Sequence, residues 1–209
     1  MPYATPRVRG RREGIRRLRI PLPPLPSYTI NMEKSSGMRR KDREILDPGI
    51  FREILMANNS AYVSLVDNGA PYGIMMNYAP RFLGGEIQLL FHGAQEGRKI
   101  DCLRQCPQAC VFINDRQAEA VSLQGERPSG RTTTHYRSLI LQGTMHFLPD
   151  GEEKRLAAQC FLQHFAQGGG EVEMPPEAML AKTAFLLFRP ASITGKANPP
   201  IPPREAARP

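Results

Sequence analysis

The chain has 209 residues and a mass of 23.4 kDa, with 41% hydrophobic residues, 23% charged residues and a formal net charge of +8. This length suits one domain with its own hydrophobic core. No apolar run approaches the roughly 20 residues that a membrane-spanning helix needs, which excludes a transmembrane protein. Four cysteines without a clear secretory leader argue against a disulfide framework and predict a cytoplasmic protein.

The positive charge is concentrated at the N-terminus. Residues 1–37 carry a net charge of +6, whereas the remaining 172 residues carry only +2. A basic chain suggests an anionic partner such as nucleic acid. Because the body is nearly neutral, that suggestion applies to the tail, and nucleic acid is not the expected partner of the body.

The N-terminal segment, residues 1–37, is expected to be an extended or disordered tail. It combines arginines with four prolines between Ile20 and Tyr28, and proline removes backbone donors and prevents helix continuation. A secretory leader, a twin-arginine signal, a phosphate-binding arm and a proline-rich docking segment are alternatives. We favour a dispensable extension, with the natural start near Met38. A second proline-rich tail is expected at residues 198–209.

The first part of the body predicts one helix and a hairpin. Asp47 is typical of a helix N-cap and Pro48 of the first helical position; the apolar face that follows comprises Ile50, Phe51, Ile54 and Leu55. Residues 61–66 and 72–77 are predicted strands. The turn Asp67-Asn68-Gly69 between them is typical of a hairpin, because Asn and Gly tolerate positive φ.

The middle of the body predicts three more strands and a short helix. The turn Gly84-Gly85 leads into a strand at residues 86–91, and a loop over residues 92–97 precedes a helix at 98–105 that Pro107 ends. Residues 109–114 and 118–123 are predicted strands.

The last part predicts a long strand at residues 136–148, with a bulge or bend at Gly143. Asp150 and Glu153 suggest a capping box for a helix at 152–165, whose inward face is expected to comprise Leu156, Cys160, Phe161 and Phe165. The glycines at 168–170 end this helix, and residues 183–188 form the last strand. Six or seven strands with a few short helices predict an α+β, mainly β fold: a small antiparallel barrel with covering helices.

The cysteines and most histidines are interpreted as structural. Cys102, Cys106 and Cys110 are spaced four apart, and neither zinc nor iron–sulfur sites usually show this spacing, so no metal site is predicted. His135, His146 and His164 show no ligand-pair spacing. His92 differs from them, because it stands at a strand end and opens a glycine-containing loop.

The residues from His92 to Lys99 form the pattern with the clearest chemical meaning. Gly93 and Gly97 let a backbone approach a ligand, and Arg98 and Lys99 open a helix whose first N–H groups attract anions. A phosphate group fits this environment, and a solvated turn with a basic helix start is an equal alternative. Neither a nucleotide-triphosphate loop nor a dinucleotide-binding glycine motif is present.

The chain resembles the flavin-nucleotide-binding proteins related to pyridoxamine 5′-phosphate oxidase, especially their nitroimidazole-resistance branch. The resemblance covers the body from Met38 to Lys196. It rests on six elements in the family's order: residues 38–45, 71–78, 91–99, 136–143, 152–154 and 193–196.

This resemblance implies an FMN-binding split β-barrel of residues 38–197 that forms a homodimer with the flavin in an interface groove. The implied cofactor-binding residues are Ile74, Met76, Asn77, Tyr78, His92, Glu96, Arg98 and Lys99. His92 matches a histidine at the flavin pocket and is the candidate catalytic residue. Since adjacent helical residues point about 100° apart, one cation should dominate phosphate binding, and we expect it to be Lys99.

The expected function is a flavin-dependent oxidoreductase acting on a small molecule, with nitro-compound reduction as one option. One alternative is a haem-binding or haem-handling protein with His92 as an axial ligand. A further alternative is a non-enzymatic nucleic-acid or partner-binding module that uses the basic tail. Phe91, Ile113 and Leu139 are candidates for an apolar surface that a dimer would bury.

Overall fold

The computed structural model describes residues 38–115, 121–122, 133–166 and 173–198. Both expected tails therefore lie outside the described residues, except that the last strand ends at Asn198. The strands are β1 (Glu44–Ile45), β2 (Ser60–Asp67), β3 (Ala70–Leu83), β4 (Glu86–Ala94), β5 (Gln108–Asn114), β6 (Val121–Ser122), β7 (Thr133–Thr134), β8 (Tyr136–Phe147) and β9 (Thr183–Asn198). The helices are η1 (Lys41–Arg43), α1 (Pro48–Ala57), α2 (Arg98–Gln105), α3 (Glu152–Phe165) and α4 (Glu177–Ala181).

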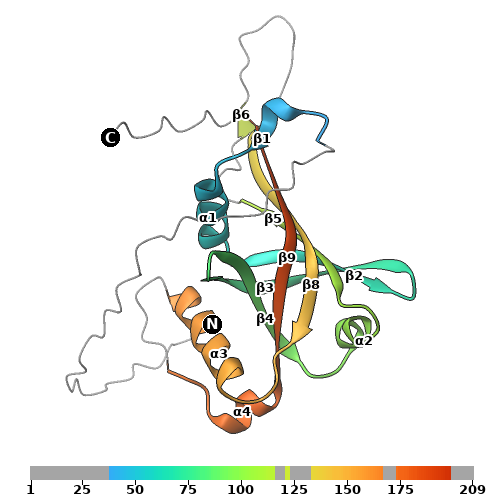
Figure 1. The fold of residues 1–209 in the computed structure, drawn as a ribbon, viewed down its shortest axis with the longest axis vertical. Helices are drawn as coiled ribbons and strands as arrows, with labels where there is room; N and C mark the ends of the chain where they lie inside the picture. Colours follow the sequence, from blue (N-terminus) through green and yellow to red (C-terminus); the bar gives the residue numbers. More distant parts are fainter. Residues whose placement is uncertain (1–37, 116–120, 123–132, 167–172, 199–209) are drawn as a thin grey trace, which may run out of the picture.

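Seven strands form one antiparallel sheet that closes on itself. The order is β1-β9-β4-β3-β2-β5-β8, and β8 also pairs with β9, so the strands from β9 to β8 close into a ring and β1 pairs with β9 outside it. Figure 1 shows β8 and β9 side by side along the long axis of the molecule. The predicted α+β, mainly β fold with an antiparallel barrel is therefore confirmed.

The ring is split at one place, between β3 and β4. These two strands pair from Leu83 opposite Glu86 up to Tyr78 opposite Phe91, and there the pairing stops. The first half of β3 continues along β2 alone, whereas the end of β4 continues along β9 alone. The two strands thus diverge and leave a fork, which we define as residues 70–77 of β3 and residues 92–94 of β4.

Local sequence signals account for the start of the barrel. Asp47 accepts a hydrogen bond from the Gly49 N–H at 2.7 Å and caps α1, whose four predicted apolar residues are all buried. The hairpin between β2 and β3 turns at Asn68, with φ 50°, and Gly69, with φ 82°. Both predictions are confirmed, since positive φ at these two positions is what a tight hairpin turn requires.

The helix α3 has its predicted bounds, but its predicted cap is wrong. Gly151, with φ 132°, occupies the N-cap without a side-chain hydrogen bond, and Asp150 instead accepts from Lys154 at 2.6 Å. Leu156 and Phe165 were expected to face inward and are exposed. The buried residues of α3 are Lys154, Ala157, Ala158 and Phe161, and Cys160 packs against the same cluster, so the prediction is confirmed for Phe161 and Cys160.

The bulge is confirmed, and the last strand is longer than predicted. The register of β8 against β9 shifts between Gln142 and Gly143, where Gly143 lies opposite Pro190. Proline is tolerated at a bulge because no ladder N–H is needed there, so β9 runs through it to Asn198. The strand predicted at 118–123 lies outside the described residues apart from β6, and so do the glycines at 168–170.

Two clusters of buried side chains hold the fold together. One fills the barrel, and the other lies between α3 and the outer side of β3, β4 and β9. Phe91, Ile113 and Leu139 belong to the barrel interior and have no exposed surface, so their prediction as a dimer surface is wrong. They alternate with outward residues along their strands, and sequence alone does not say which set faces inward.

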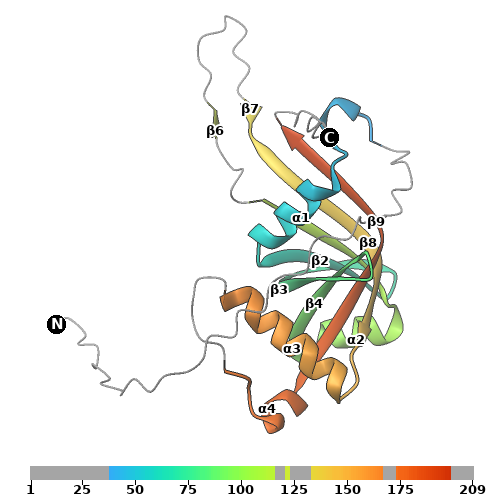
Figure 2. The same ribbon diagram turned by 60° about the vertical axis from the view of Figure 1, so that its left-hand side comes forward.

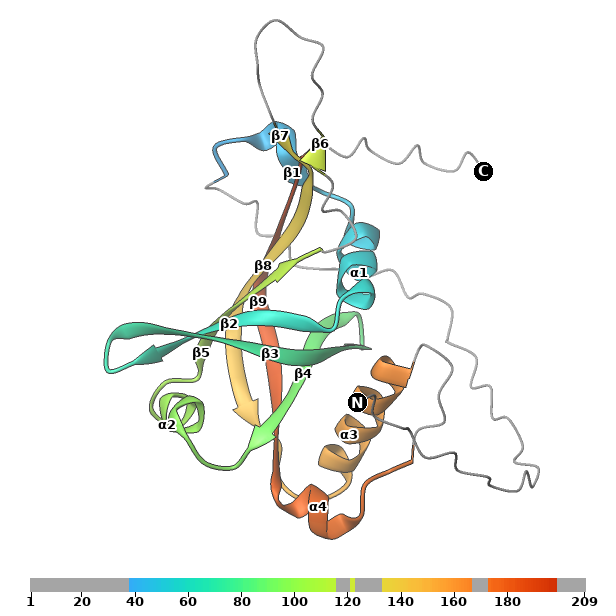
Figure 3. The ribbon, with the colours of Figure 1, turned by 180° about the vertical axis from the view of Figure 1, so that it is seen from behind.

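The helices leave part of the barrel's outer face uncovered. Figures 1 and 3 show α1 and α3 on one side of the molecule, with the β2–β3 hairpin and α2 on the opposite side. Figure 2 shows α3 lying across the lower half of the sheet with α4 beneath it. Among the described residues, no helix is both long and apolar enough to cross a membrane.

Candidate functional site

The fork between β3 and β4 places a helix start beside an open strand edge. Residues 70–77 of β3 bond to β2 on one side, and on the other side the described strands provide no partner. α2 begins immediately after β4, and its buried residues Ile100, Cys102 and Leu103 anchor it to the barrel. Its N-cap is Gly97, with φ 108° and no side-chain cap, so the first N–H groups of α2 keep their capacity to bind an anion.

Lys99 extends from the first turn of α2 over the end of β4. A Cβ placed on Gly93 would lie 2.4 Å from the Lys99 Nζ and 2.9 Å from its Cε, so the lysine occupies the space above this glycine. Gly93 therefore allows this close approach of the lysine side chain, and its backbone does not have a positive φ. Within the described part of the chain, Lys99 belongs to none of the ion pairs.

Arg98 points away from Lys99 and toward the β2–β3 hairpin. Its Nε donates to the Asp67 Oδ2 at 2.7 Å, and its Nη2 lies 2.7 Å from the same oxygen. The guanidinium carbon is 4.4 Å from the centroid of the Tyr72 ring. We call these three residues the clasp. The structure thus separates the two predicted phosphate-binding cations.

His92 is the first residue of β4 beyond the region that pairs with β3. Its ring packs edge-on against Phe161 of α3 with the centroids 4.5 Å apart, and the Phe185 ring is 5.9 Å away. Partial burial, together with the charge of Lys99, lowers the pKa of His92 below its usual range. The imidazole is therefore neutral at pH 7 and able to accept a proton.

The predicted residues on β3 divide between the two faces of the barrel. Tyr78 and Met76 are buried in the interior, and Ile74 packs against the same cluster. The Tyr78 hydroxyl donates to the Leu55 carbonyl at 3.0 Å, and burial raises its pKa well above the usual range. The side chains of Ile74, Met76 and Tyr78 thus pack in the barrel, and the backbone edge of residues 70–77 is open.

Asn77 and His92 occupy the next register positions beyond the Tyr78–Phe91 pair. Since Tyr78 and Phe91 face inward, the alternation along both strands directs Asn77 and His92 to the outer side. Glu96 is exposed in the loop between β4 and α2. Of the predicted residues, the structure therefore brings Asn77, His92 and Lys99 to the fork, and it directs Arg98 elsewhere.

The uncovered outer face beside the fork carries an apolar row. Met75, Tyr62, Phe112 and Ile140 are successive cross-strand neighbours on β3, β2, β5 and β8. Tyr62, Met75 and Ile140 are 53%, 47% and 43% exposed, and the Tyr62 and Phe112 ring centroids lie 6.4 Å apart. We call these four residues the outer row.

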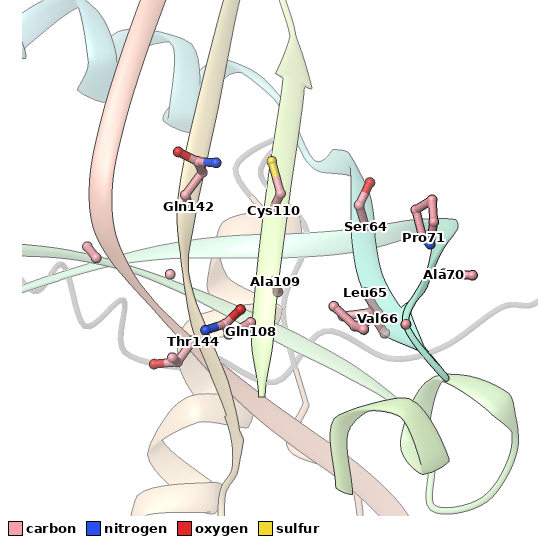
Figure 4. A pocket seen from close by; sticks show the side chains of 13 residues that line it. Ser64, Leu65, Val66, Ala70, Pro71, Gln108, Ala109, Cys110, Gln142 and Thr144 are labelled. Atoms are coloured by element: carbon pink, nitrogen blue, oxygen red, sulfur yellow. The ribbon is translucent and has the colours of Figure 1, made fainter. Parts of the chain in front are cut away.

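A groove of about 700 Å³ lies next to the outer row. Figure 4 shows its floor, with Ser64 of β2, Cys110 and Gln108 of β5, and Gln142 and Thr144 of β8. The wall at the hairpin comprises Val66, Gly69, Ala70 and Pro71. Ala70 and Pro71 of the fork line this groove, but His92, Glu96 and Lys99 do not.

The four cysteines are free thiols, and the histidine of α3 is held by contacts with its neighbours. Cys102 is buried and the other three cysteines are half-buried thiols. The His164 Nε2 lies 3.1 Å from the Asn58 carbonyl oxygen, and its ring stacks on Tyr78. Among the described residues, no group of three or more histidine, cysteine or carboxylate side chains is placed to bind a metal.

Sequence reasoning missed the clasp and the role of Gly93. A weak signal for the clasp was available, because Asp67 is a hairpin carboxylate and Tyr72 stands five residues later at the strand start. Nothing in the sequence tied either to Arg98, which is 31 residues from Asp67. Gly93 was expected to let the backbone approach a ligand, and in the structure the Lys99 side chain lies in the space next to it.

The closed antiparallel ring with one open fork defines a split β-barrel protein. Residues 49–197 match the family described as pyridoxamine 5′-phosphate oxidase. The chain belongs to this family, and the predicted resemblance is confirmed. No curated protein sequence matches the chain.

Solved structures with the same fold share little sequence with this chain. A candidate 5-nitroimidazole antibiotic resistance protein from Bacteroides thetaiotaomicron has a TM-score of 0.63 at 21% identity, over 74% of this chain and 86% of its own. An FAD- and haem-binding protein from Mycobacterium smegmatis has a TM-score of 0.63 at 21% identity, covering 78% and 77%. The flavocytochrome Anf3 from Azotobacter vinelandii has a TM-score of 0.60 at 19% identity, covering 84% and 78%. These similarities establish the fold.

Proposed function

We propose that this protein binds FMN at the fork and acts as a flavin-dependent oxidoreductase on a small molecule. The observation that carries the proposal is the pairing of an open strand edge on β3 with Lys99 and the uncapped start of α2. Its family and its flavin-binding structural neighbours support the same conclusion.

The residues present fit a flavin nucleotide. A phosphate carries close to two negative charges, and it needs donors and a cation when it leaves water. Lys99 supplies an ammonium group that no described carboxylate neutralises, and α2 supplies backbone N–H groups. The open backbone edge of residues 70–77 offers N–H and C=O groups to the polar rim of the ring system.

The flavin supplies the redox chemistry when it is bound, and the protein supplies orientation and proton handling. His92 is the proposed proton-handling residue, because its neutral imidazole lies at the fork on the outer side. Asn77 is the first residue of β3 beyond the region that pairs with β4, and its amide is proposed to orient the ring or the substrate. The substrate is a small molecule, and reduction of nitro compounds is one reaction that this site could perform.

A homodimer completes the proposal. The outer row lies on a face that no described helix covers. Two of its side chains, Tyr62 and Met75, are more than 45% exposed. A second copy related by a twofold axis would bury this row and the adjoining groove. The same face adjoins the fork, so the partner would also help to exclude water from the flavin.

Haem is the alternative cofactor, and the names of two structural neighbours favour testing it. The only histidine at the fork among the described residues is His92, and its ring is engaged by Phe161. FMN is the better proposal, because the fork offers a phosphate site and only one candidate axial ligand.

The test of FMN binding is titration of the apoprotein with FMN and with riboflavin, which lacks the phosphate. We expect Lys99→Ala to lose about 1.5–3 kcal/mol of FMN binding, or about ten- to a hundredfold in affinity, because it removes a charge-assisted contact. Riboflavin affinity should not change. Lys41→Ala, which removes an exposed lysine from η1, is the matched control. Equal FMN affinity in Lys99→Ala and Lys41→Ala would contradict the site.

A further inference from the structure

The clasp joins two parts of the proposed flavin site that are distant in sequence. Asp67 ends β2 and Tyr72 stands near the start of β3, on the strand whose open edge faces the fork. Arg98 is the first residue of α2, next to Lys99. A single guanidinium therefore connects the strand that would face the ring with the helix turn that would bind the phosphate.

The geometry of the clasp is specific to arginine. Two of its nitrogens contact one carboxylate oxygen at 2.7 Å, while its plane lies over an aromatic face at 4.4 Å. The pairing with Asp67 raises the pKa of Arg98, which keeps its charge fixed. Lysine lacks the planar fork that makes both contacts at once.

The clasp also engages two of the three guanidinium nitrogens of Arg98. Nε and Nη2 both contact the Asp67 carboxylate, so a forked phosphate contact through this pair of nitrogens would have to displace it. Asp67 is 20% exposed and stays beside the guanidinium, so a phosphate approaching Arg98 would meet a carboxylate. Lys99 has no such carboxylate among its described ion-pair partners.

We propose that Arg98 is a positioning residue, which together with Asp67 and Tyr72 fixes the distance between β3 and the first turn of α2. This inference rests on the proposed flavin site and assigns phosphate recognition to Lys99 and α2 alone. The clasp acts on the whole flavin, because it sets the spacing between the ring side and the phosphate side. An arginine that bound the phosphate directly would act on the phosphate alone.

Asp67→Asn separates these two roles. If Arg98 positions the helix, Asp67→Asn weakens FMN and riboflavin binding by the same factor, about three- to tenfold. If Arg98 binds the phosphate, Asp67→Asn frees the guanidinium, and FMN affinity stays equal or rises. Arg98→Gln should match Asp67→Asn, and the double variant should be no worse than either single variant, because one interaction is removed only once.

The experiment is titration of both flavins into the full-length parent, Asp67→Asn, Arg98→Gln and the double variant. Arg104→Gln removes the same charge from the other end of α2 and should leave both affinities unchanged. A loss confined to FMN in Arg98→Gln, or tighter FMN binding in Asp67→Asn, would overturn the proposal.

Amide hydrogen exchange in the flavin-free protein provides a readout that does not depend on the cofactor. We expect faster exchange at Ile100 and Asp101, whose N–H groups bond to the Gly97 carbonyl, in Asp67→Asn and Arg98→Gln. Unchanged exchange would overturn the clasp even if flavin binds. If the parent binds neither flavin but exchange rises in both variants, the proposed function fails while the clasp stands.

Discussion

Single residues at the fork have roles that their neighbours determine. His92 and Lys99 are both close to Gly93, yet one faces α3 and the other crosses the end of β4. The helix packing lowers the pKa of His92 by removing water, and the ammonium of Lys99 lowers it further. The same residue types in an exposed loop would titrate normally and would offer no prepared site.

We expect the pKa of His92 to lie below that of an unperturbed histidine and to rise in Lys99→Ala. NMR titration of the imidazole signals measures both values directly. The lysine contribution is the smaller of the two causes, so the pKa in the variant should remain below the usual value. Lys41→Ala should leave it unchanged, and an unshifted parent pKa would contradict the packing described for His92.

The lowered pKa of His92 also makes a contribution to stability that depends on pH. Because the folded state binds the proton less readily than the unfolded state, this contribution is fully present above about pH 6.5 and is lost as the pH falls through the folded pKa. His164 acts in the same direction, since burial lowers its pKa as well.

Asp115 is the most deeply buried charged side chain among the described residues. It has no exposed surface, and it accepts hydrogen bonds from Arg137 at 2.8 Å and from Asn58 at 3.2 Å. Asp115→Ala should reduce the free energy of unfolding by about 1.5–3 kcal/mol, because it removes a charged hydrogen-bond partner from Arg137, which among the described residues keeps only its ion pair with Glu53. Chemical denaturation measures the loss. Asp101→Ala, at an exposed pair, should lie within about 0.5 kcal/mol of the parent.

At the scale of elements, the contact between β8 and β9 closes the barrel. Gly143 lies at the bulge, and a Cβ on it would be 2.1 Å from the Arg189 carbonyl oxygen and 2.7 Å from the Pro190 Cα. Both neighbours are backbone atoms, which cannot rotate away as a side chain can. The longest strand pairing of the described sheet therefore depends on this glycine for its close approach.

Gly143→Ala should destabilise the protein by about 1–3 kcal/mol, since a methyl group would force the two strands apart. Gly73→Ala on β3 is the matched control, because a Cβ there would meet no atom within 4 Å. Thermal and denaturant unfolding compare the two variants. A Gly143→Ala protein as stable as Gly73→Ala would show that the bulge is not tightly packed.

The elements also show how far the sequence predicts the fold. The hairpin at Asn68 and Gly69 and the cap at Asp47 were predictable, because each depends on local backbone chemistry. The length of β9 was not predictable, because a proline such as Pro190 usually ends a strand. Its position at the bulge, opposite Gly143, lets the strand continue. β1, two residues long, exists through its pairing with Lys196 and Gly195, which no local signal reveals.

The candidate site was predictable to the level of residue types and no further. The basic helix start was visible, and Lys99 was correctly separated from Arg98 by the helical twist. The pairing of Arg98 with Asp67 could not be predicted, since the fold alone brings the β2–β3 hairpin next to the start of α2. Likewise, the inward or outward direction of Phe91 and Asn77 required the strand register.

At the scale of the whole molecule, the proposed homodimer predicts the behaviour of the outer row. Tyr62→Lys should produce monomers at micromolar concentration, because a charge at a central aromatic position opposes burial. Leu83→Lys, at an exposed apolar position on the β3–β4 turn, is the matched control and should remain dimeric. Sedimentation velocity measures both. A parent that is monomeric with flavin bound would contradict the dimer.

The central claim is that this split barrel is a flavoprotein with a phosphate site at Lys99. The most direct measurement is the absorption spectrum of the purified protein after incubation with FMN and removal of unbound cofactor. We expect a protein-bound flavin spectrum in the parent that is greatly reduced in Lys99→Ala and retained in Lys41→Ala. A Soret band in place of flavin bands, or no retained flavin at all, would contradict it.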